Sequence, residues 1–250
     1  MNAGMKKGKI HIGTSGWIYE HWIGVFYPKG MPERKRLEFL AQHFDTVEIN
    51  YSFYKLPAIK TLERWKEVTP RKFTFSVKAS RYITHIKRLD NVRDAWLAFL
   101  RRAQKLEKKL GPILLQFPPT FKFNKENAGR LERFLALKAN RDLKLAFEFR
   151  DISWQNQEIF GLFRKNNAAF VSADSPRVHF KETVTADFAY VRMHGGEKMS
   201  GLKYSKTELK ALADKIKTWS LTGIDSYVYF NNDVGGYAVE NARDLVFYMR

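Results

Sequence analysis

The chain has 250 residues, a net charge of +18, an aromatic content of 15% and no cysteine. This composition fits a globular protein and excludes disulfides, thiolate catalysis and cysteine-ligated metal sites. No apolar run reaches the roughly 18 residues of a membrane span, and no apolar signal segment follows the basic start, so we expect a soluble, cytoplasmic protein without a membrane partner.

Eight short apolar runs recur along the chain, and most of them end in polar or charged residues. They predict strands over residues 9–13, 46–50, 73–78, 113–117, 144–149, 169–174, 190–194 and 227–232. Most of the gaps between the runs can hold a helix. Eight strand–helix units predict a TIM-like (β/α)₈ barrel, an α/β fold whose active face lies at the C-terminal strand ends.

Apolar spacing in the gaps predicts helices over residues 32–44, 57–69, 90–110, 124–139 and 205–220. Ser205 and Glu208 form a capping box for the last of these helices. The pattern between residues 174 and 190 is short, so the sixth helix is predicted to be degenerate or replaced by a loop. We expect residues 1–8 to be a disordered extension and residues 9–250 to form a single domain.

A doubly wound open sheet is the structural alternative. That fold would show fewer strands and a glycine-rich phosphate fingerprint after the first one. The first turn, at residues 13–17, reads GTSGW, which is not a GxGxxG motif. The number of units therefore favours the closed barrel.

Polar side chains cluster at the predicted C-terminal strand ends. Side chains alternate along a strand, so residues two apart share a face, and the apolar ones should point to the helices. The residues predicted to face the barrel mouth are Glu48, Asn50, Lys78, Gln116, Glu148, Arg150, Asp174, Arg192, His194 and Asn231. A glutamate–arginine pair in a barrel can be purely structural. Burying so many uncompensated ions in a dry interior would cost several kcal/mol of desolvation free energy per ion. The pattern therefore favours a solvated surface at the barrel mouth that faces a ligand.

The same residues allow more than one kind of site. Glu48, Glu148, Asp174 and His194 are of the types that bind hard metal ions. No HxH or HExxH spacing occurs, however, and the nearby lysine and arginines would repel a cation, so we predict no metal site. The sequence does not indicate a cofactor or an oligomeric state.

The positive charge is unevenly distributed along the chain. Residues 1–150 contain 31 lysines and arginines against 14 acidic residues, whereas residues 151–250 contain 13 against 12. A basic surface attracts polyanions such as nucleic acid, anionic lipid or a phosphorylated ligand. The alternative is that these residues lie on helix surfaces and only aid solubility.

Several motifs occur in a fixed order along the chain and resemble the DUF72, or YecE-like, family over residues 10–245. They are GTSGW at 13–17 with Trp22 and FYP at 26–28, TVEIN at 46–50 with FY at 53–54 and Pro57, GP at 111–112, QFPP at 116–119, EFR at 148–150 with Trp154, YVRMHG at 190–195, and YFNND at 229–233. The resemblance implies a TIM-like barrel and brings no established reaction. One departure is Ser52, where a threonine is expected next to Phe53.

The leading hypothesis is a barrel that binds a phosphate-bearing ligand, such as nucleic acid or a nucleotide, at its C-terminal face. Three groups of residues are predicted to act in it, and hydrolysis of a phosphoester is left open. Lys78, Arg150 and Arg192 would hold the anion, with Gln116, Asp174 and Asn231 as further ligand contacts; Trp17 and Tyr54 would stack on a base or ring; Glu48 or Glu148 would act as general base and His194 as acid.

Two other functions remain as alternatives. Glu48 and Glu148 are a candidate carboxylate pair for a carbohydrate-active hydrolase, with aromatic residues stacking on the sugar. The third hypothesis is a non-catalytic protein whose charged floor holds a small metabolite.

Overall fold

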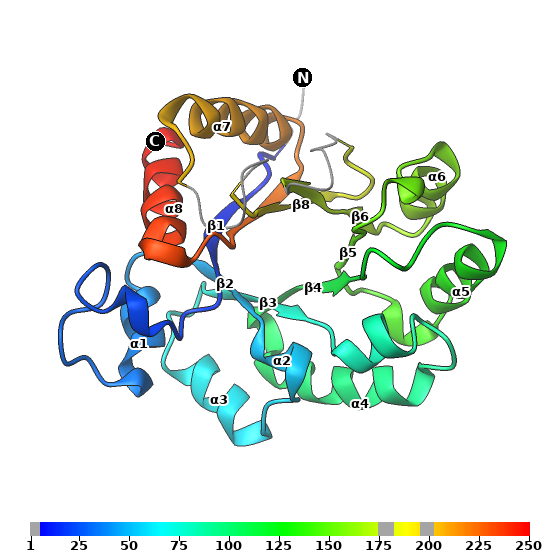
Figure 1. Cartoon of the computed structure of the whole chain (residues 1–250), viewed down its shortest axis with the longest axis horizontal. Helices are drawn as coiled ribbons and strands as arrows, with labels where there is room; N and C mark the ends of the chain where they lie inside the picture. Colours follow the sequence, from blue (N-terminus) through cyan, green and yellow to red (C-terminus); the bar gives the residue numbers. More distant parts are fainter. Residues whose placement is uncertain (1–5, 175–182, 196–202) are drawn as a thin grey trace.

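The structure is a computed structural model that describes residues 6–174, 183–195 and 203–250. Its strands are all parallel and form one sheet in the order β6-β5-β4-β3-β2-β1-β9-β8-β7, surrounded by helices (Figure 1). The strands are β1 (Ile10–Ser15), β2 (Thr46–Ile49), β3 (Thr74–Lys78), β4 (Leu110–Gln116), β5 (Leu145–Glu148), β6 (Ala169–Phe170), β7 (Ser172–Asp174), β8 (Phe188–Met193) and β9 (Asp225–Phe230).

The two edge segments of this sheet, β6 and β7, are adjacent in the chain. β6 pairs with β5 and β7 pairs with β8, and only Val171 separates them. The backbone N–H of Val171 still donates to the carbonyl of Phe147, at 2.9 Å. The sixth predicted strand is therefore divided between both of its neighbours, which nearly closes the sheet. The predicted TIM-like barrel is confirmed.

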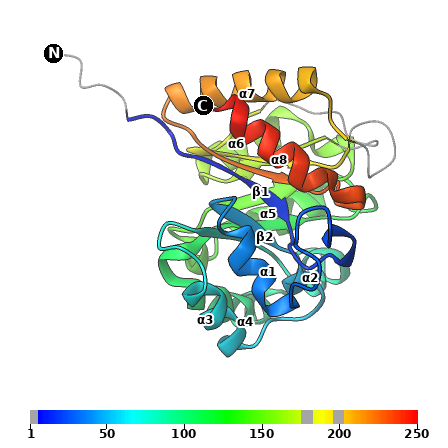
Figure 2. The same cartoon turned by 90° about the vertical axis from the view of Figure 1, so that its left-hand side faces the viewer.

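Helices follow most of the strands and cover the outside of the barrel. They are α1 (Glu33–Leu40), α2 (Tyr51–Tyr54), α3 (Ile59–Glu67), α4 (Arg93–Ala103), α5 (Lys125–Leu135), α6 (Gln157–Lys165), α7 (Lys206–Leu221) and α8 (Tyr237–Tyr248). α7 and α8 lie on one side of β1, and α1, α3 and α4 lie on the other (Figure 2). In the described part of the chain, no helix combines the length and the apolar character needed to span a bilayer.

Helix ends follow local chemistry where the capping signal is strong. The capping box at Ser205 and Glu208 is present in both directions, as predicted. The predicted helix over residues 90–110 is shorter, because α4 ends at Ala103 and a 3₁₀ turn, η3 (Gln104–Lys109), follows. The φ of Glu107 is +53° inside this turn, which ends helical geometry just before β4 begins. Apolar residues at helical spacing continue through this turn, so the periodicity predicted a helix that was too long.

Two expectations concern segments at the limits of the described residues. The degenerate sixth helix would lie after β7, where residues 175–182 fall outside the described residues and residues 183–187 form no helix. Residues 1–5 of the expected extension also fall outside them. Gly8, however, donates its N–H to the Ser220 carbonyl at 2.8 Å and accepts from the Ser220 hydroxyl at 2.7 Å. Gly8 is therefore bonded to the last turn of α7.

The alternation of side chains divides the core into two parts. Val228 and its neighbours on the outer face pack against the helices. Tyr190 and Tyr229 belong to a second cluster inside the barrel. The Tyr229 hydroxyl lies 2.7 Å from those of both Thr46 and Ser76, so polar contacts cross the interior below the barrel mouth. This period of two is what directs the next residues of the same strands toward the mouth.

Candidate functional site

A cavity of about 300 Å³ opens at the C-terminal strand ends, on the predicted face of the barrel. Its lining combines cationic, amide and aromatic side chains. Eight of the lining residues were predicted from the sequence: Asn50, Tyr54, Lys78, Gln116, Arg150, Arg192, His194 and Asn231; the others are Tyr19 and Phe53. Pockets of this size usually hold small molecules.

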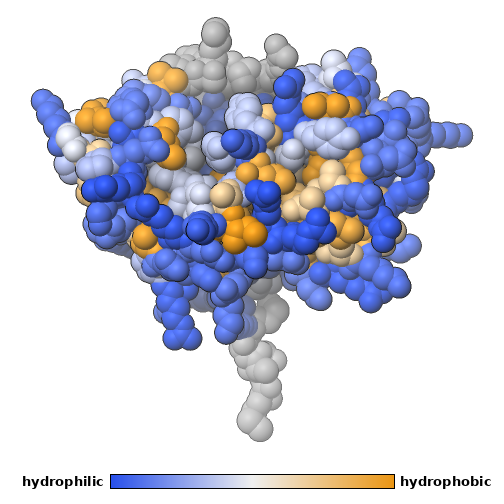
Figure 3. All heavy atoms as spheres, turned by 90° about the horizontal axis from the view of Figure 1, so that it is seen from below, coloured by the Kyte–Doolittle hydropathy of each residue, from blue (hydrophilic) through white to orange (hydrophobic). Residues whose placement is uncertain are grey.

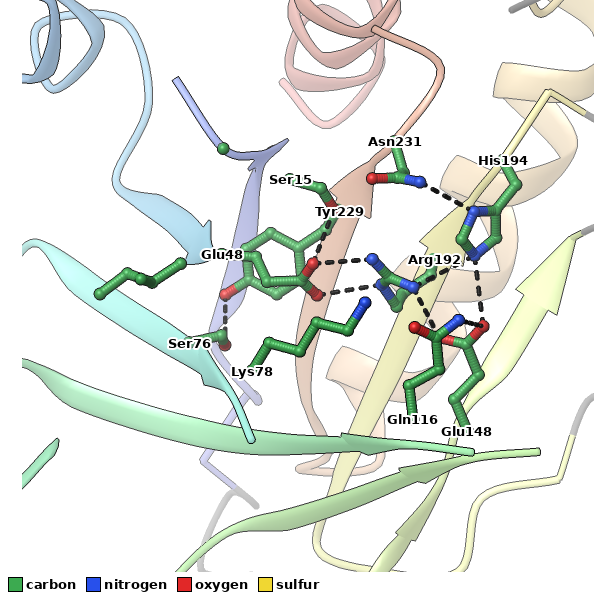
Figure 4. Close-up of polar contacts among 12 residues, drawn as sticks. Ser15, Glu48, Ser76, Lys78, Gln116, Glu148, Arg192, His194, Tyr229 and Asn231 are labelled. Atoms are coloured by element: carbon green, nitrogen blue, oxygen red, sulfur yellow. Dashed lines mark hydrogen bonds and ion pairs between the residues drawn. The ribbon is translucent and has the colours of Figure 1, made fainter. Parts of the chain in front are cut away.

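The floor of the cavity is a buried ion cluster centred on Arg192 (Figure 4). The Arg192 Nε and Nη2 donate to both carboxylate oxygens of Glu48, at 3.0 and 2.8 Å. Its Nη1 donates to Glu148 Oε2 at 2.7 Å. Both glutamates are fully buried, and Arg192 is 1% exposed. One guanidinium therefore joins two carboxylates from β2 and β5 across the barrel.

Further groups fix the two carboxylates in place. The Ser15 and Tyr190 hydroxyls donate to Glu48 at 2.9 and 2.7 Å, and Gln116 donates to Glu148 at 3.2 Å. Sequence reasoning missed Ser15 and Tyr190. Tyr190 carries a signal, because it lies two residues before Arg192 on the same strand face. Ser15 lies in the GTSGW motif, but the first strand was predicted to end at residue 13, so the direction of its side chain could not be assigned.

The cluster holds both glutamates ionised. Burial alone would raise their pKa values, but Arg192 and Lys78 lower that of Glu48 below its usual range. Arg150 and Arg192 likewise hold the pKa of Glu148 well below its usual range. A weakly basic, fully bonded carboxylate is a poor general base. The carboxylates of Glu48 and Glu148 balance the charge of the buried Arg192. Because its guanidinium is bonded to both of them, Arg192 is less available to bind a ligand anion.

His194 lies against this cluster and is held in its uncharged form. Its Nε2 is 3.1 Å from Arg150 Nη2, and its Nδ1 is 3.0 Å from the Asn231 amide nitrogen. Nε2 also lies 3.4 Å from Glu148 Oε1, a contact that favours protonation, whereas burial and the two neighbouring arginines oppose it and prevail. Burial lowers the pKa of His194 to about 4. The predicted role of His194 as an acid does not fit an imidazole that is uncharged at neutral pH.

The lowered pKa of His194 predicts a pH-dependent stability. The unfolded chain takes up a proton at this histidine near pH 6.5, whereas the folded chain does so only near pH 4. Stability should therefore fall as the pH drops through this window, by about 2 kcal/mol at pH 5. Urea unfolding at pH 7.5 and pH 5.0 measures this loss. His194→Gln should lose less stability between the two pH values than the wild type.

A second histidine, His85, titrates in the same pH window, so it contributes to the same loss of stability and has to be separated from His194. Burial and the nearby cation of Lys78 also lower the pKa of His85 to about 4. His194→Gln should therefore reduce the slope without removing it, and the double variant with His85→Gln should remove most of it. An equal loss in the wild type and in both variants would show that His194 is not held neutral.

Two cationic side chains line the cavity beside the cluster. Arg150 Nε lies 2.7 Å from Glu148 Oε1 in an ion pair, and the Arg150 side chain is 20% exposed. Lys78 extends from the end of β3 toward Arg192, with its Nζ 4.4 Å from the Phe53 ring centroid (Figure 4). Burial and the Arg192 charge lower the pKa of Lys78 to about 8. These two groups are the cationic contacts available to a ligand.

The predicted aromatic contacts lie in different places. Tyr54 is 81% exposed and lines both the cavity and a neighbouring groove of about 820 Å³. Trp17 is 5% exposed, packs edge-on against Trp65 and lines only the groove. Trp17 therefore borders the groove and not the charged cavity, and its stacking on a ligand ring stays a prediction.

Asp174, predicted as a ligand contact, contacts another side chain instead of lining the cavity among the described residues. It ends β7, and its Oδ2 accepts a hydrogen bond from the Tyr204 hydroxyl at 2.8 Å. It is not among the cavity-lining residues in the described part of the chain. Within residues 6–174, 183–195 and 203–250, no three His, Asp or Glu side chains lie close enough to hold a metal ion.

Ser52 shows how the departure from the family pattern is accommodated. It lies in the short helix α2, and its hydroxyl contacts the backbone carbonyls of Lys78 at 2.6 Å and Ile49 at 3.2 Å. A hydroxyl at this position thus ties α2 to the end of β3. Serine supplies the same donor that a threonine would.

Together, the fold and the site define a TIM-like barrel with a charged cavity at its C-terminal strand ends. The model of the family described as "Protein of unknown function DUF72" matches residues 11–250. The chain therefore belongs to the DUF72 family, as its motifs indicated.

Relatives of known sequence and structure agree with this assignment. The UPF0759 protein YunF of Bacillus subtilis is 28% identical, over 95% of this chain and 93% of that protein. The UPF0759 protein YecE of Escherichia coli K12 is 34% identical over 112 residues, which are 45% of this chain and 39% of YecE. The crystal structure of a DUF72 family protein from Thermotoga maritima superposes with a TM-score of 0.85 at 28% identity, covering 96% of this chain and 98% of that one.

Proposed function

We propose that the protein binds a small phosphate-bearing ligand in the cavity at the barrel mouth. The observation that carries this proposal is the arrangement of charge. Lys78 and Arg150 line the cavity, whereas the carboxylates of Glu48 and Glu148 are buried beneath it and bonded to Arg192. A ligand entering from solvent therefore meets cations first.

The charges of these five groups do not cancel. Three cations stand against two anions, while the nearby His194 is neutral. A cluster with one positive charge in excess favours an anion and disfavours a metal cation. A phosphate accepts several hydrogen bonds from a guanidinium fork and an ammonium, which makes it a close chemical match to Arg150 and Lys78.

Polar and aromatic groups around the cavity suit the rest of such a ligand. The amides of Gln116, Asn231 and Asn50 line the wall, and Asn50 Oδ1 is buried without a hydrogen-bond partner among the described residues. The exposed ring of Tyr54 lies between the cavity and the neighbouring groove. A sugar phosphate or a nucleotide could place its phosphate in the cavity and its ring beside Tyr54.

Binding of nucleic acid stays a prediction. Many basic residues of the first 150 lie exposed on outer helices, such as Lys60 on α3, Arg101 on α4 and Lys105 in η3. The face beneath the barrel in Figure 1 is hydrophilic over most of its area, with small hydrophobic spots between (Figure 3). Exposed basic residues on outer helices suit a solvated surface. A ligand that occupies the compact cavity is the better-supported form of the proposal.

The carbohydrate-active alternative receives less support. Glycoside hydrolysis by a carboxylate pair needs one protonated acid and one free carboxylate. Both Glu48 and Glu148 have lowered pKa values and are bonded to the same guanidinium. The proposal therefore concerns binding of an anion, not hydrolysis of a glycoside.

Inorganic phosphate provides the test of this proposal. Isothermal titration of the purified protein with phosphate should give one site. Arg150→Met should weaken that site by at least about tenfold, because one charge-assisted contact is lost. The control Arg164→Met changes an exposed arginine on α6 and should bind phosphate like the wild type.

Three results would count against the proposal. They are an absence of phosphate binding, equal affinity in wild type and Arg150→Met, and a weaker site in Arg164→Met as well. A parallel titration with single-stranded and duplex DNA and RNA over a salt series tests the macromolecular form. Salt-independent binding of DNA and RNA in the millimolar range would exclude nucleic acid as the ligand and leave a small phosphate-bearing molecule.

A further inference from the structure

Lys78 occupies a position from which its amine can reach a bound ligand. It is the last residue of β3, and its mostly buried side chain runs along Phe53 into the cavity. Its backbone is fixed, because the carbonyl accepts a hydrogen bond from the Ser52 hydroxyl at 2.6 Å. The amine is thus held in a defined place in the cavity lining.

In the described residues no hydrogen bond and no ion pair to this amine is found, and its contact is with the face of the Phe53 ring. A second buried lysine in this chain shows the usual alternative. The Nζ of Lys109 donates to the carbonyls of Lys66 and Thr69, at 2.5 and 2.7 Å, and so serves a structural purpose. Lys78 lacks such contacts although it is placed in a cavity, and its amine is free for a ligand.

The charge state of Lys78 supports a chemical role. Burial and the repulsion of Arg192 lower the pKa of Lys78 to about 8. At pH 7 about a tenth of the amine is then uncharged, against less than a thousandth for an ordinary lysine. An uncharged amine in an apolar or cationic environment is an activated nucleophile.

We propose that Lys78 is the amine that forms an imine with the carbonyl group of the bound ligand, so that the substrates are small aldehydes or ketones carrying a phosphate. The proposal rests on the proposed phosphate-binding function. Arg150 would hold the phosphate while the carbonyl carbon lies against Lys78 Nζ. Both groups line the same cavity of about 300 Å³, which suits a compact sugar phosphate in its open-chain form.

The reaction balances without any further reagent. The uncharged Lys78 nitrogen forms a bond to the carbonyl carbon, the carbonyl π bond breaks, and one proton passes from nitrogen to oxygen to give a neutral carbinolamine. The C–O bond then breaks, and the remaining proton of the nitrogen joins the leaving hydroxyl to give water, which yields the imine. Protonation of the imine restores the positive charge at the position of the original ammonium. The carboxylates of Glu48 and Glu148, whose charges favour the ammonium form of Lys78, would also stabilise this iminium.

Reductive trapping tests the proposal on the full-length protein. Glyceraldehyde 3-phosphate is added with sodium cyanoborohydride, and the adducts are located by peptide mass spectrometry. We expect a single adduct at Lys78, formed at least tenfold faster than any adduct at the exposed Lys60. Its rate should rise with a midpoint near pH 8, whereas an exposed lysine should need a higher pH.

Matched variants complete the experiment. Lys78→Met keeps the contact with Phe53 and should remove the fast adduct, while Lys60→Met should retain it. Melting curves of both variants show whether the fold is preserved. If Lys78→Met does not fold, the location of the adduct on the wild-type protein still tests the proposal. Labelling of Lys78 no faster than of Lys60, or labelling spread over the exposed lysines, would overturn the proposal.

The outcome separates this inference from the proposed function. Phosphate binding that depends on Arg150, without an adduct at Lys78, would overturn the imine and keep the phosphate site. Uncharged glyceraldehyde that labels Lys78 as fast as its phosphate ester, in a protein that binds no phosphate, would keep the amine's role. That result would overturn the phosphate-binding function instead.

Discussion

Replacing Arg192 with methionine is expected to lower the free energy of unfolding by about 3–5 kcal/mol or more, because two buried carboxylates lose their shared partner. Glu48 and Glu148 have no exposed surface, so water cannot replace the guanidinium. The loss should be greatest at neutral pH. It should shrink in acid, where the variant can protonate both glutamates. Urea unfolding of Arg192→Met between pH 4 and pH 8 measures this dependence.

Two further proteins show whether the charge or the packing of Arg192 matters. Arg36 is also buried, but its partner Glu20 is largely exposed and can be hydrated. Arg36→Met should therefore cost clearly less than Arg192→Met. Adding Glu48→Gln and Glu148→Gln to Arg192→Met should recover part of the stability at pH 7. If Arg192→Met and Arg36→Met are equally stable, the ion cluster does not hold the barrel mouth together.

Glu148→Gln is expected to change stability and ligand affinity in opposite directions. The variant removes the carboxylate that pairs with Arg150 and Arg192, at 2.7 Å from each. Unfolding should become easier by about 2–4 kcal/mol, somewhat less than for Arg192→Met, since glutamine keeps the shape. The freed charge of Arg150 should tighten phosphate binding by about tenfold. Urea unfolding and phosphate titration on the same preparation measure both effects.

Glu48→Gln is the matched control for this prediction. It removes the same charge from the opposite side of Arg192, where Ser15 and Tyr190 also contact the carboxylate. It should destabilise the fold to a similar degree but tighten phosphate binding less, because Arg150 keeps its partner. Weaker phosphate binding in Glu148→Gln than in the wild type would contradict the assignment of Arg150 as the anion contact.

The barrel and most of its mouth were predictable because strand geometry is periodic. Once a run such as residues 46–50 is taken as a strand, the apolar Val47 and Ile49 assign Glu48 to the other face. The same rule placed Lys78, Glu148 and Arg192, and parallel strands gather these ends at one edge. The division of the sixth strand at Val171 was not predictable, because it depends on how the sheet closes rather than on any local signal.

Which of these residues contact each other could not be derived from the sequence. Periodicity gives the direction of Arg192, but its bonds to Glu48 and Glu148 depend on the barrel diameter and on strand stagger. The same holds for Lys78, whose contacts with Ser52 and Phe53 also join positions that are distant in the sequence. The sequence could therefore not show that Glu48 and Glu148 both pair with Arg192, nor that no such ion pair to Lys78 is found among the described residues.

The bonds of Arg192 have a mechanical consequence for the barrel. The side chain starts on β8 and reaches β2 and β5, none of which is a neighbour of another in the sheet. Its hydrogen bonds therefore hold the ends of these three strands at a fixed separation and so fix the width of the barrel mouth. Loops above the opening can therefore differ in length or sequence between relatives while the spacing of the groups below them is preserved.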